Sequence, residues 1–191
     1  MLWTLIGVSK SIAQLMDLSS DAPRLNLSPF DVQLRRRLWW TICRLESRAV
    51  EEYGFNPSNV GRLAQDSFPL NLNDEDLYPE ATEAPQPRSG FTDMTLPLIG
   101  FDITCLVTRI NSSHLLSTET TDYQSENVIQ RKIKMVEDCQ AGLESKYLQH
   151  FNASRPFDWM TMTFNRLMVV SYALHHPSMA HAHIDRRSAA S

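Results

Sequence analysis

The sequence has few of the residues that build disulfide frameworks or phosphate-binding loops. Only three of its 191 residues are cysteine, Cys43, Cys105 and Cys139, and none belongs to a C-x-x-C pair. An odd, widely spaced set of cysteines argues against the disulfide scaffold of a small secreted protein and favours a reducing compartment such as the cytoplasm. With only six glycines, the sequence also contains no G-x-G-x-x-G or G-x-x-x-x-G-K motif for holding phosphate groups.

A basic surplus and long apolar runs are missing as well. The 18 lysines and arginines are outnumbered by 22 acidic residues, which leaves a formal net charge of −4. Since proteins that hold a nucleic-acid backbone carry a basic excess, we do not expect this chain to bind DNA directly. The most apolar window, residues 157–174, contains Asp158 and Arg166, and charges are costly at the centre of a bilayer. We therefore expect no membrane-spanning helix.

Helical patterning is clearest from Ser28 onward. Ser28 can cap a helix, Pro29 suits its first turn, and Asp31 can return a bond to the cap. Apolar residues then recur three and four apart until a stop signal at Gly54, at Phe30, Leu34, Leu38, Ile42, Leu45 and Ala49. This stripe predicts the buried face of a helix over residues 28–54.

The same helix carries a second apolar face and a run of arginines. Trp39 and Trp40 fall opposite the stripe, so we expect a central helix that neighbours cover on two sides. The arginines at 35–37 interrupt this surface, and nearby carboxylates can absorb their charge, as Asp31 can for Arg35. Because the run lies inside the most apolar helix, it favours a structural role over a nuclear-import signal or a phosphate patch.

A long loop separates the second predicted helix from the third. Before the central helix, an amphipathic helix is predicted to end near Asp17. After the central helix, about 35 residues rich in Pro, Asn and Gly begin at Asn56. A helix that is apolar almost all round begins behind a cap at Thr92 and Asp93. A loop of this length within a compact domain usually has a role or is partly disordered.

Two more helices are predicted behind a polar stretch. One covers about residues 125–151, and the other runs from Pro156 to Pro177. The first should expose a charged side made of Arg131, Lys132, Lys134, Glu137 and Asp138. Neither strand alternation nor a repeat occurs, so the predicted fold class is all-α, a multi-helix fragment with a long Pro/Asn-rich loop between its second and third helices.

Two patterns are reminiscent of metal sites, but neither has the required spacing. Four histidines lie within nine residues, yet His175 and His176 are adjacent and no pair that includes His181 or His183 stands four residues apart. The acidic stretch 71–76 lacks the Gly and the Glu of a calcium loop, which favours an ordinary turn. Each cysteine lies in an apolar helical stretch, where core packing is a better interpretation than a Cys-His nucleophile.

Three groups of motifs follow one another in a fixed order along the chain. The central helix carries LSPF at 27–30, RRRLWW at 35–40 and LESRA at 45–49; the loop carries FPLNLNDEDL at 68–77, and GFTDMT at 90–95 precedes the third helix. Together they resemble the regulatory middle region of fungal-specific transcription factors with a binuclear zinc cluster (Zn2Cys6). The matching signature residues are Ser28, Pro29, Phe30, Arg35, Arg36, Arg37, Trp39, Trp40, Asn73, Asp74, Asp76, Thr92 and Asp93.

The resemblance implies an all-helical regulatory domain over residues 1–177. The terminal residues 178–191 are expected to form a flexible tail. The arginine-tryptophan motif would be the scaffold's central helix, and the Asn and Asp residues of the loop motif would fix the loop. The family implies no catalytic residue, and no cofactor or metal in this chain, because its zinc belongs to an N-terminal cluster of six cysteines. The present chain has only three cysteines, so it resembles an internal piece of a larger regulator.

The resemblance also implies a mode of action. The chain would regulate transcription in the nucleus through protein partners, such as a homologous transcription factor or a second copy, or through a small-molecule effector. It would reach DNA only through a module outside it. Two alternatives stay open: a standalone helical module that pairs with full-length relatives, and a truncated fragment without function whose apolar faces stay exposed. A metal enzyme built on the histidines is disfavoured by their spacing, so we expect no enzymatic activity.

Overall fold

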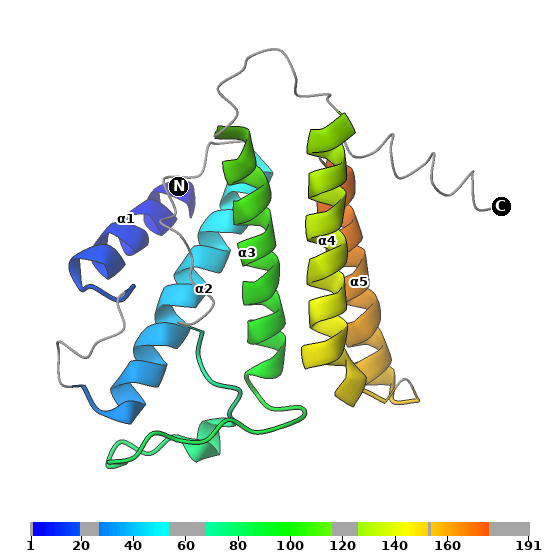
Figure 1. Cartoon of the computed structure of the whole chain (residues 1–191). Coiled ribbons are helices and arrows are strands. Elements are labelled where there is room, and N and C mark those ends of the chain that lie inside the picture. The colour runs from blue at the N-terminus through cyan, green and yellow to red at the C-terminus, as the bar shows by residue number, and fades with distance from the viewer. Residues whose placement is uncertain (1, 20–26, 54–67, 116–125, 153, 176–191) are drawn as a thin grey trace. The chain divides into compact units, whose positions relative to one another are not determined.

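The computed structural model describes residues 2–19, 27–53, 68–115, 126–152 and 154–175 (Figure 1). Within these ranges lie five α-helices and two short 3₁₀ helices, and no strand. In chain order they are α1 (Leu2–Leu15), α2 (Pro29–Tyr53), η2 (Asp74–Asp76), α3 (Thr95–Leu115), α4 (Glu126–Lys146), η3 (Leu148–His150) and α5 (Pro156–His175). The all-α prediction is confirmed. The predicted tail and the histidines beyond His175 lie outside the described residues.

The chain divides into two compact units, Met1–Thr108 and Arg109–Ser191, with the boundary inside α3. The first unit contains α1, α2, the loop that carries η2, and most of α3. The second contains α4, η3 and α5. None of the helices in the described ranges combines the length and apolar character that crossing a bilayer requires.

Helix α1 packs on α2 and ends in a left-handed turn (Figure 1). Asp17 has a φ of 51°, and the amides of Asp17 and Leu18 donate to the carbonyls of Gln14 and Ala13, both at 2.9 Å. This is the Schellman pattern of helix termination, and Leu18 and Ala13, the two positions whose side chains usually meet in it, are both buried. The chain therefore leaves α1 in a defined direction, as the predicted helix end near Asp17 required.

Helix α2 begins as predicted, at the Ser28 cap. The Ser28 hydroxyl accepts the Asp31 amide at 3.1 Å and donates to Asp31 Oδ2 at 2.7 Å. Trp39 and Trp40 are buried, which confirms that the tryptophan face is covered.

The prediction for the opposite face of α2 was only half right. Ile42 and Ala49 are buried, but Leu34, Leu38 and Leu45 keep 43%, 50% and 49% of their surface exposed. The physical reason is that α1 covers one side of α2 and the loop with α3 covers another, so part of the apolar stripe lies on neither contact surface. The periodicity identified an apolar face correctly but overstated how much of it is buried.

Three aromatic rings join α2, the loop and α3. Trp40 is fully buried, and its ring centroid lies 4.4 Å from Phe68 in an edge-on arrangement and 5.7 Å from Phe101. The Phe68 and Phe101 rings are 6.1 Å apart. Such spacings are favourable for aromatic pairs, so the cluster stabilises the packing of the three segments beyond the burial of its area.

Helix α3 is buried over most of the length that lies in the first unit, as its apolar pattern predicted. The buried side chains include Leu98, Ile99, Phe101, Ile103, Cys105, Leu106 and Val107. Gly100 marks a close approach to α2, because a Cβ at this position would lie 3.1 Å from Arg44 Nη1. The small residue lets the long Arg44 side chain lie across α3.

In the second unit, α4 and α5 form an antiparallel hairpin through η3 (Figure 1). Arg131, Lys134, Glu137 and Asp138 are exposed on α4 as predicted, whereas Lys132 is only 1% exposed. Its assignment to the exposed charged side was wrong because position 132 lies four residues before Val136 and eleven before buried Leu143, on the apolar stripe. Burial lowers the pKa of the Lys132 ammonium.

Candidate functional site: the α2 arginines and the loop before α3

The three consecutive arginines of α2 reach three different segments, since successive helical positions point about 100° apart. Arg35 Nη2 donates to the carbonyl oxygens of Met16 and Asp17, at 2.7 Å and 2.9 Å. The predicted pairing of Arg35 with Asp31 is therefore wrong. The left-handed turn that ends α1 leaves these two carbonyls available, and the guanidinium binds them.

The other two arginines bind the loop. Arg36 Nη1 donates to the Phe68 carbonyl at 3.3 Å, and Arg37 Nη1 donates to Asp74 Oδ1 at 2.6 Å. Arg37 thus holds η2 against α2 through one charge-assisted hydrogen bond. All three guanidinium groups are engaged within the first unit rather than directed to an external anion.

Asn71 is the most fully bonded side chain of the loop. Its Nδ2 donates to the carbonyls of Arg88 and Gly90, both at 2.9 Å. Its Oδ1 accepts the hydroxyls of Thr92 at 2.6 Å and Thr95 at 3.2 Å. Since an amide side chain has two N–H donors and an oxygen that accepts two bonds, the hydrogen-bonding capacity of Asn71 is fully used. One residue therefore joins the middle of the loop to its end and to the first residue of α3.

A second crosslink joins η2 to the turn before α3. The Asp93 amide donates to Asn73 Oδ1 at 3.1 Å, and the Asp74 amide donates to Asp93 Oδ2 at 3.0 Å. The hydroxyl of Thr92 accepts the Met94 amide at 3.2 Å, just ahead of α3. The predicted cap residues Thr92 and Asp93 thus form the turn that precedes α3, which begins at Thr95.

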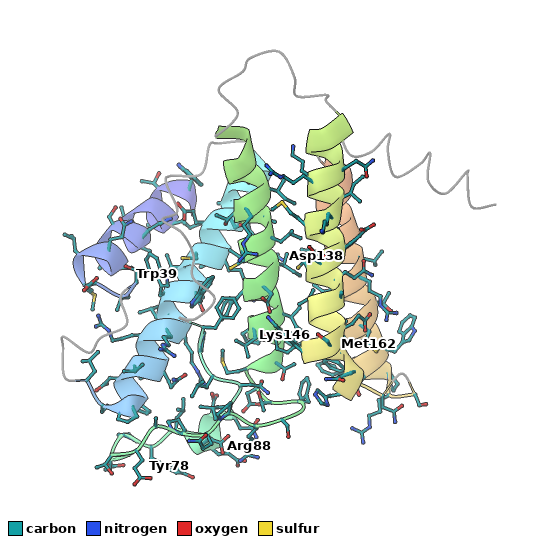
Figure 2. The ribbon with its side chains drawn as sticks, in the orientation of Figure 1. Trp39, Tyr78, Arg88, Asp138, Lys146 and Met162 are labelled. Atoms are coloured by element: carbon teal, nitrogen blue, oxygen red, sulfur yellow. The ribbon has the colours of Figure 1, made fainter. Side chains whose placement is uncertain are left out.

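Asp76 closes η2 and binds Arg88 across the loop. Its Oδ2 accepts the Asn73 amide at 2.9 Å, and its Oδ1 accepts Arg88 Nη2. Figure 2 shows Arg88 and Tyr78 on the connection between α2 and α3. The hydrogen bond from Arg88, supported by the Asn73 amide, lowers the pKa of the Asp76 carboxyl, and Asp76 in turn raises the pKa of Arg88.

Gly90 is required by the backbone of the same loop. Its φ is +90°, a left-handed conformation that L side chains rarely adopt, and its carbonyl is one of the two that Asn71 binds.

The remaining signature residues lie at the start of α2. Pro29 is the first residue of α2, and Phe30 beside it is half-buried.

Several contacts of this site were missed by sequence reasoning. Gln33, buried on α2, accepts the Leu70 amide at 2.9 Å, and Lys10 of α1 forms a buried ion pair with Glu46 of α2. Asn71 was assigned only to the loop motif as a whole. For Lys10 a usable signal existed, because it is the one charged residue of an otherwise uncharged helix.

Two of the three cysteines lie in the core of the first unit. Burial raises the pKa of Cys43 to about 12, so its thiol stays protonated near neutral pH, and Cys105 is buried as well. In the ranges that the structure describes, no group of three or more His, Cys, Asp or Glu side chains is placed to hold a metal ion. What the arrangement does is to join α1, α2, the loop and α3.

Known proteins similar to this chain are fungal transcription factors. The aurofusarin cluster transcription factor aurR2 of Gibberella zeae is 31% identical over 187 residues, which is 94% of this chain and 27% of that protein. The pyriculol/pyriculariol biosynthesis cluster transcription factor 1 of Pyricularia oryzae is 40% identical over 97 residues, 51% of this chain and 13% of that protein. The C6 finger domain transcription factor hasF of Aspergillus fumigatus is 28% identical over 178 residues, 84% of this chain and 23% of that protein.

The chain spans about a quarter or less of the length of these relatives. No family model matches it. No solved structure matches it either.

Proposed function

This chain is related over most of its length to a region of fungal Zn2Cys6 transcription factors, and we propose that it regulates transcription as a helical regulatory region. The observation that carries the proposal is the 31% identity to a fungal cluster transcription factor through 94% of the chain. The relatives are named as transcription factors rather than enzymes, which supports a regulatory and non-catalytic role.

The charges of the chain support action through protein contacts rather than through its own DNA-binding surface. Its net charge is −4, and Arg35, Arg36 and Arg37 are engaged with backbone carbonyls and Asp74. Arginines that are held in this way are not free to neutralise phosphates. We assign DNA reading to a separate zinc-cluster module, since three cysteines cannot supply a six-cysteine site.

The role proposed for the signature residues is structural. Trp40 and the three arginines hold α2 at the centre of the first unit, and Asn73, Asp74 and Asp76 hold the loop against it. The chain would act in the nucleus, where its protein partners and the DNA-binding module are found.

A tethering experiment tests this function. The full chain is fused to an unrelated sequence-specific DNA-binding domain and expressed in a fungal strain that carries a reporter gene with the matching operator. We expect the fusion to change reporter expression several-fold, in either direction, relative to the DNA-binding domain alone. A fusion of equal abundance that leaves the reporter unchanged would contradict the proposal.

The DNA-binding part of the proposal has a separate test. A gel-shift titration of the chain alone, over fungal promoter fragments and at about 0.15 M salt, should show no sequence-specific complex, because the salt screens weak non-specific contacts. A tight and sequence-specific complex would overturn the assignment of DNA binding to another module. It would leave the regulatory role, which the reporter experiment tests, unaffected.

A further inference from the structure

Helix α1 packs on α2 with the less apolar of its two faces. Its buried residues are Ile6, Lys10 and Ala13, which lie within about 60° of one another on the helix, and we call them the inner face of α1. Only two of the three are apolar, and one of those is an alanine. Since helices in globular proteins usually turn their most apolar stripe toward the core, this choice of face needs a physical cause.

The larger apolar side chains of α1 lie on nearly the opposite side. Four of them keep between 51% and 87% of their surface exposed and lie within about 80° of one another, about 150° from the inner face. We call these residues the outer face of α1: Leu5, Val8, Ile12 and Leu15. Packed on α2, the outer face would bury more apolar area than the inner face does. Apolar burial alone therefore favours the other orientation of the helix.

The inner face makes one contact that the outer face cannot make. Lys10 Nζ donates to Glu46 Oε2 of α2, and each of the two side chains keeps only 6% of its surface exposed. Lys10 is the one charged residue of α1. Turning the helix by about 150° would carry the ammonium away and leave the Glu46 carboxylate facing apolar side chains. Separating a buried ion pair is strongly destabilising when one charge stays buried, so the pair opposes the orientation that apolar burial favours.

Further polar contacts of α1 do not distinguish its two faces. Arg35 of α2 binds the carbonyls of Met16 and Asp17, which follow the helix and belong to neither face. The hydroxyls of Ser9 and Ser11 donate to backbone carbonyls of α1 itself. Of these polar contacts, only the buried ion pair requires the inner face to be turned toward α2.

We propose that Lys10 and Glu46 are positioning residues that select the face with which α1 packs on α2. Buried polar residues have a comparable role in coiled coils, where a single polar position fixes the register of the helices at a cost in stability. Helix α1 is then a two-state element, and the ion pair holds it in the state with its inner face buried. This inference goes beyond the regulatory function and does not depend on it.

Thiol labelling at matched positions reports which face of α1 is buried. The probes are Ile6→Cys on the inner face and Ile12→Cys on the outer face, made separately in a full chain that carries Cys139→Ser. Both start from isoleucine, so the change in size is the same on either face. Because Ile6 is 8% and Ile12 is 51% exposed, position 12 should react with a water-soluble aromatic disulfide at least about tenfold faster than position 6. The background rate of the buried Cys43 and Cys105 is measured in the parent chain.

Glu46→Leu should reverse this order, so that the thiol at position 6 becomes the faster one. The Lys10 ammonium would then face a leucine, and it reaches water when α1 turns. The charge exchange Lys10→Glu with Glu46→Lys re-forms the pair and should restore the wild-type order, which a requirement for side-chain size alone would not predict. Arg48→Leu is the matched control, because it removes an exposed charge of α2 outside the pair and should leave the order unchanged.

An order of rates that Glu46→Leu leaves unchanged would overturn the inference. So would fast reaction at both positions in a chain that keeps its helicity by circular dichroism, because the pair would then attach α1 rather than select its face. A folded charge-exchange variant that keeps the reversed order would contradict the inference as well. If Glu46→Leu unfolds the chain, Lys10→Met with Glu46→Leu replaces it under the same expectations, since the outer face is still the larger apolar one.

Discussion

The surroundings of α2 and the α4–α5 hairpin are held in different ways. Around α2, the arginine run and Asn71 form hydrogen bonds to residues 17 to 37 positions away in the sequence. In the described part of the hairpin, Arg166 binds Glu144 across the two helices, and the rings of Phe157, Trp159 and Phe164 stay about half exposed. Because hydrogen bonds are directional, they specify one arrangement of the segments that they join. Exposed apolar surface favours burial but does not specify which surface covers it. The α2 region is thus held by hydrogen bonds between segments that lie far apart in the sequence, whereas α5 keeps large apolar side chains exposed.

The largest expected difference between the two regions comes from their tryptophans. Trp40→Ala should lower the free energy of unfolding by about 3–5 kcal/mol, because it removes a fully buried ring with two aromatic neighbours. Trp159→Ala should change it by less than about 0.5 kcal/mol, since the ring is largely exposed. Urea unfolding followed by far-ultraviolet circular dichroism measures both. Equal losses in the free energy of unfolding from the two variants would contradict the expected difference between the two regions.

The buried ion pair between α1 and α2 should show an asymmetry. Lys10→Met leaves the Glu46 carboxylate without its ammonium partner and should destabilise the protein by about 3–5 kcal/mol. Adding Glu46→Leu removes the stranded charge, so the double variant should recover most of the loss. The comparison is made by urea unfolding at neutral pH. A double variant that is less stable than Lys10→Met alone would contradict this explanation, because removing the stranded Glu46 charge should restore stability.

Two asparagines give a smaller contrast. Asn71→Ala removes four hydrogen bonds and leaves two carbonyls and two hydroxyls without their partner, so we expect a loss of about 2–3 kcal/mol. Asn165→Ala in the hairpin removes one bond, to the Thr161 carbonyl, and should cost about 1 kcal/mol. Differential scanning calorimetry of both variants decides the order. An Asn165 variant that melts at the lower temperature would contradict it.

Sequence reasoning predicted the helix starts and the buried tryptophans, because these depend on short-range chemistry. The Ser28 cap, the proline after it, and the spacing of Trp39 and Trp40 from the stripe are all local signals. It did not predict that Leu34 stays exposed, since periodicity identifies an apolar face but not whether a neighbour covers it.

The contacts of the site were less predictable than the helices for a physical reason. Arg35 binds backbone carbonyls, and every residue carries a carbonyl, so the sequence holds no signal for which one is chosen. The partners of Asn71 lie 17 to 24 residues away, and only the folded loop brings them together. Charge was a misleading signal for Lys132, where position on the helix decided burial.

The smallest predicted effect concerns pH. The pKa of Asp76 is lowered in the folded protein by Arg88, so the ionised carboxylate stabilises the fold above the unfolded pKa of about 3.9. This contribution is lost as the pH falls through the lower, folded value. The difference in urea midpoint between wild type and Asp76→Asn should therefore be larger at pH 6 than at pH 3. A difference that is the same at both values would show that the Arg88 contact does not stabilise the loop.

Hydrogen exchange along the whole chain, read by mass spectrometry, tests the contrast between the two regions most directly. Amides of α2 and of residues 95–108 in α3 should exchange slowest, because their side chains are buried and their segments are joined by hydrogen bonds. Amides of α5 should exchange faster, because large apolar side chains of this helix stay exposed. Protection of α5 that equals that of α2 would contradict the account.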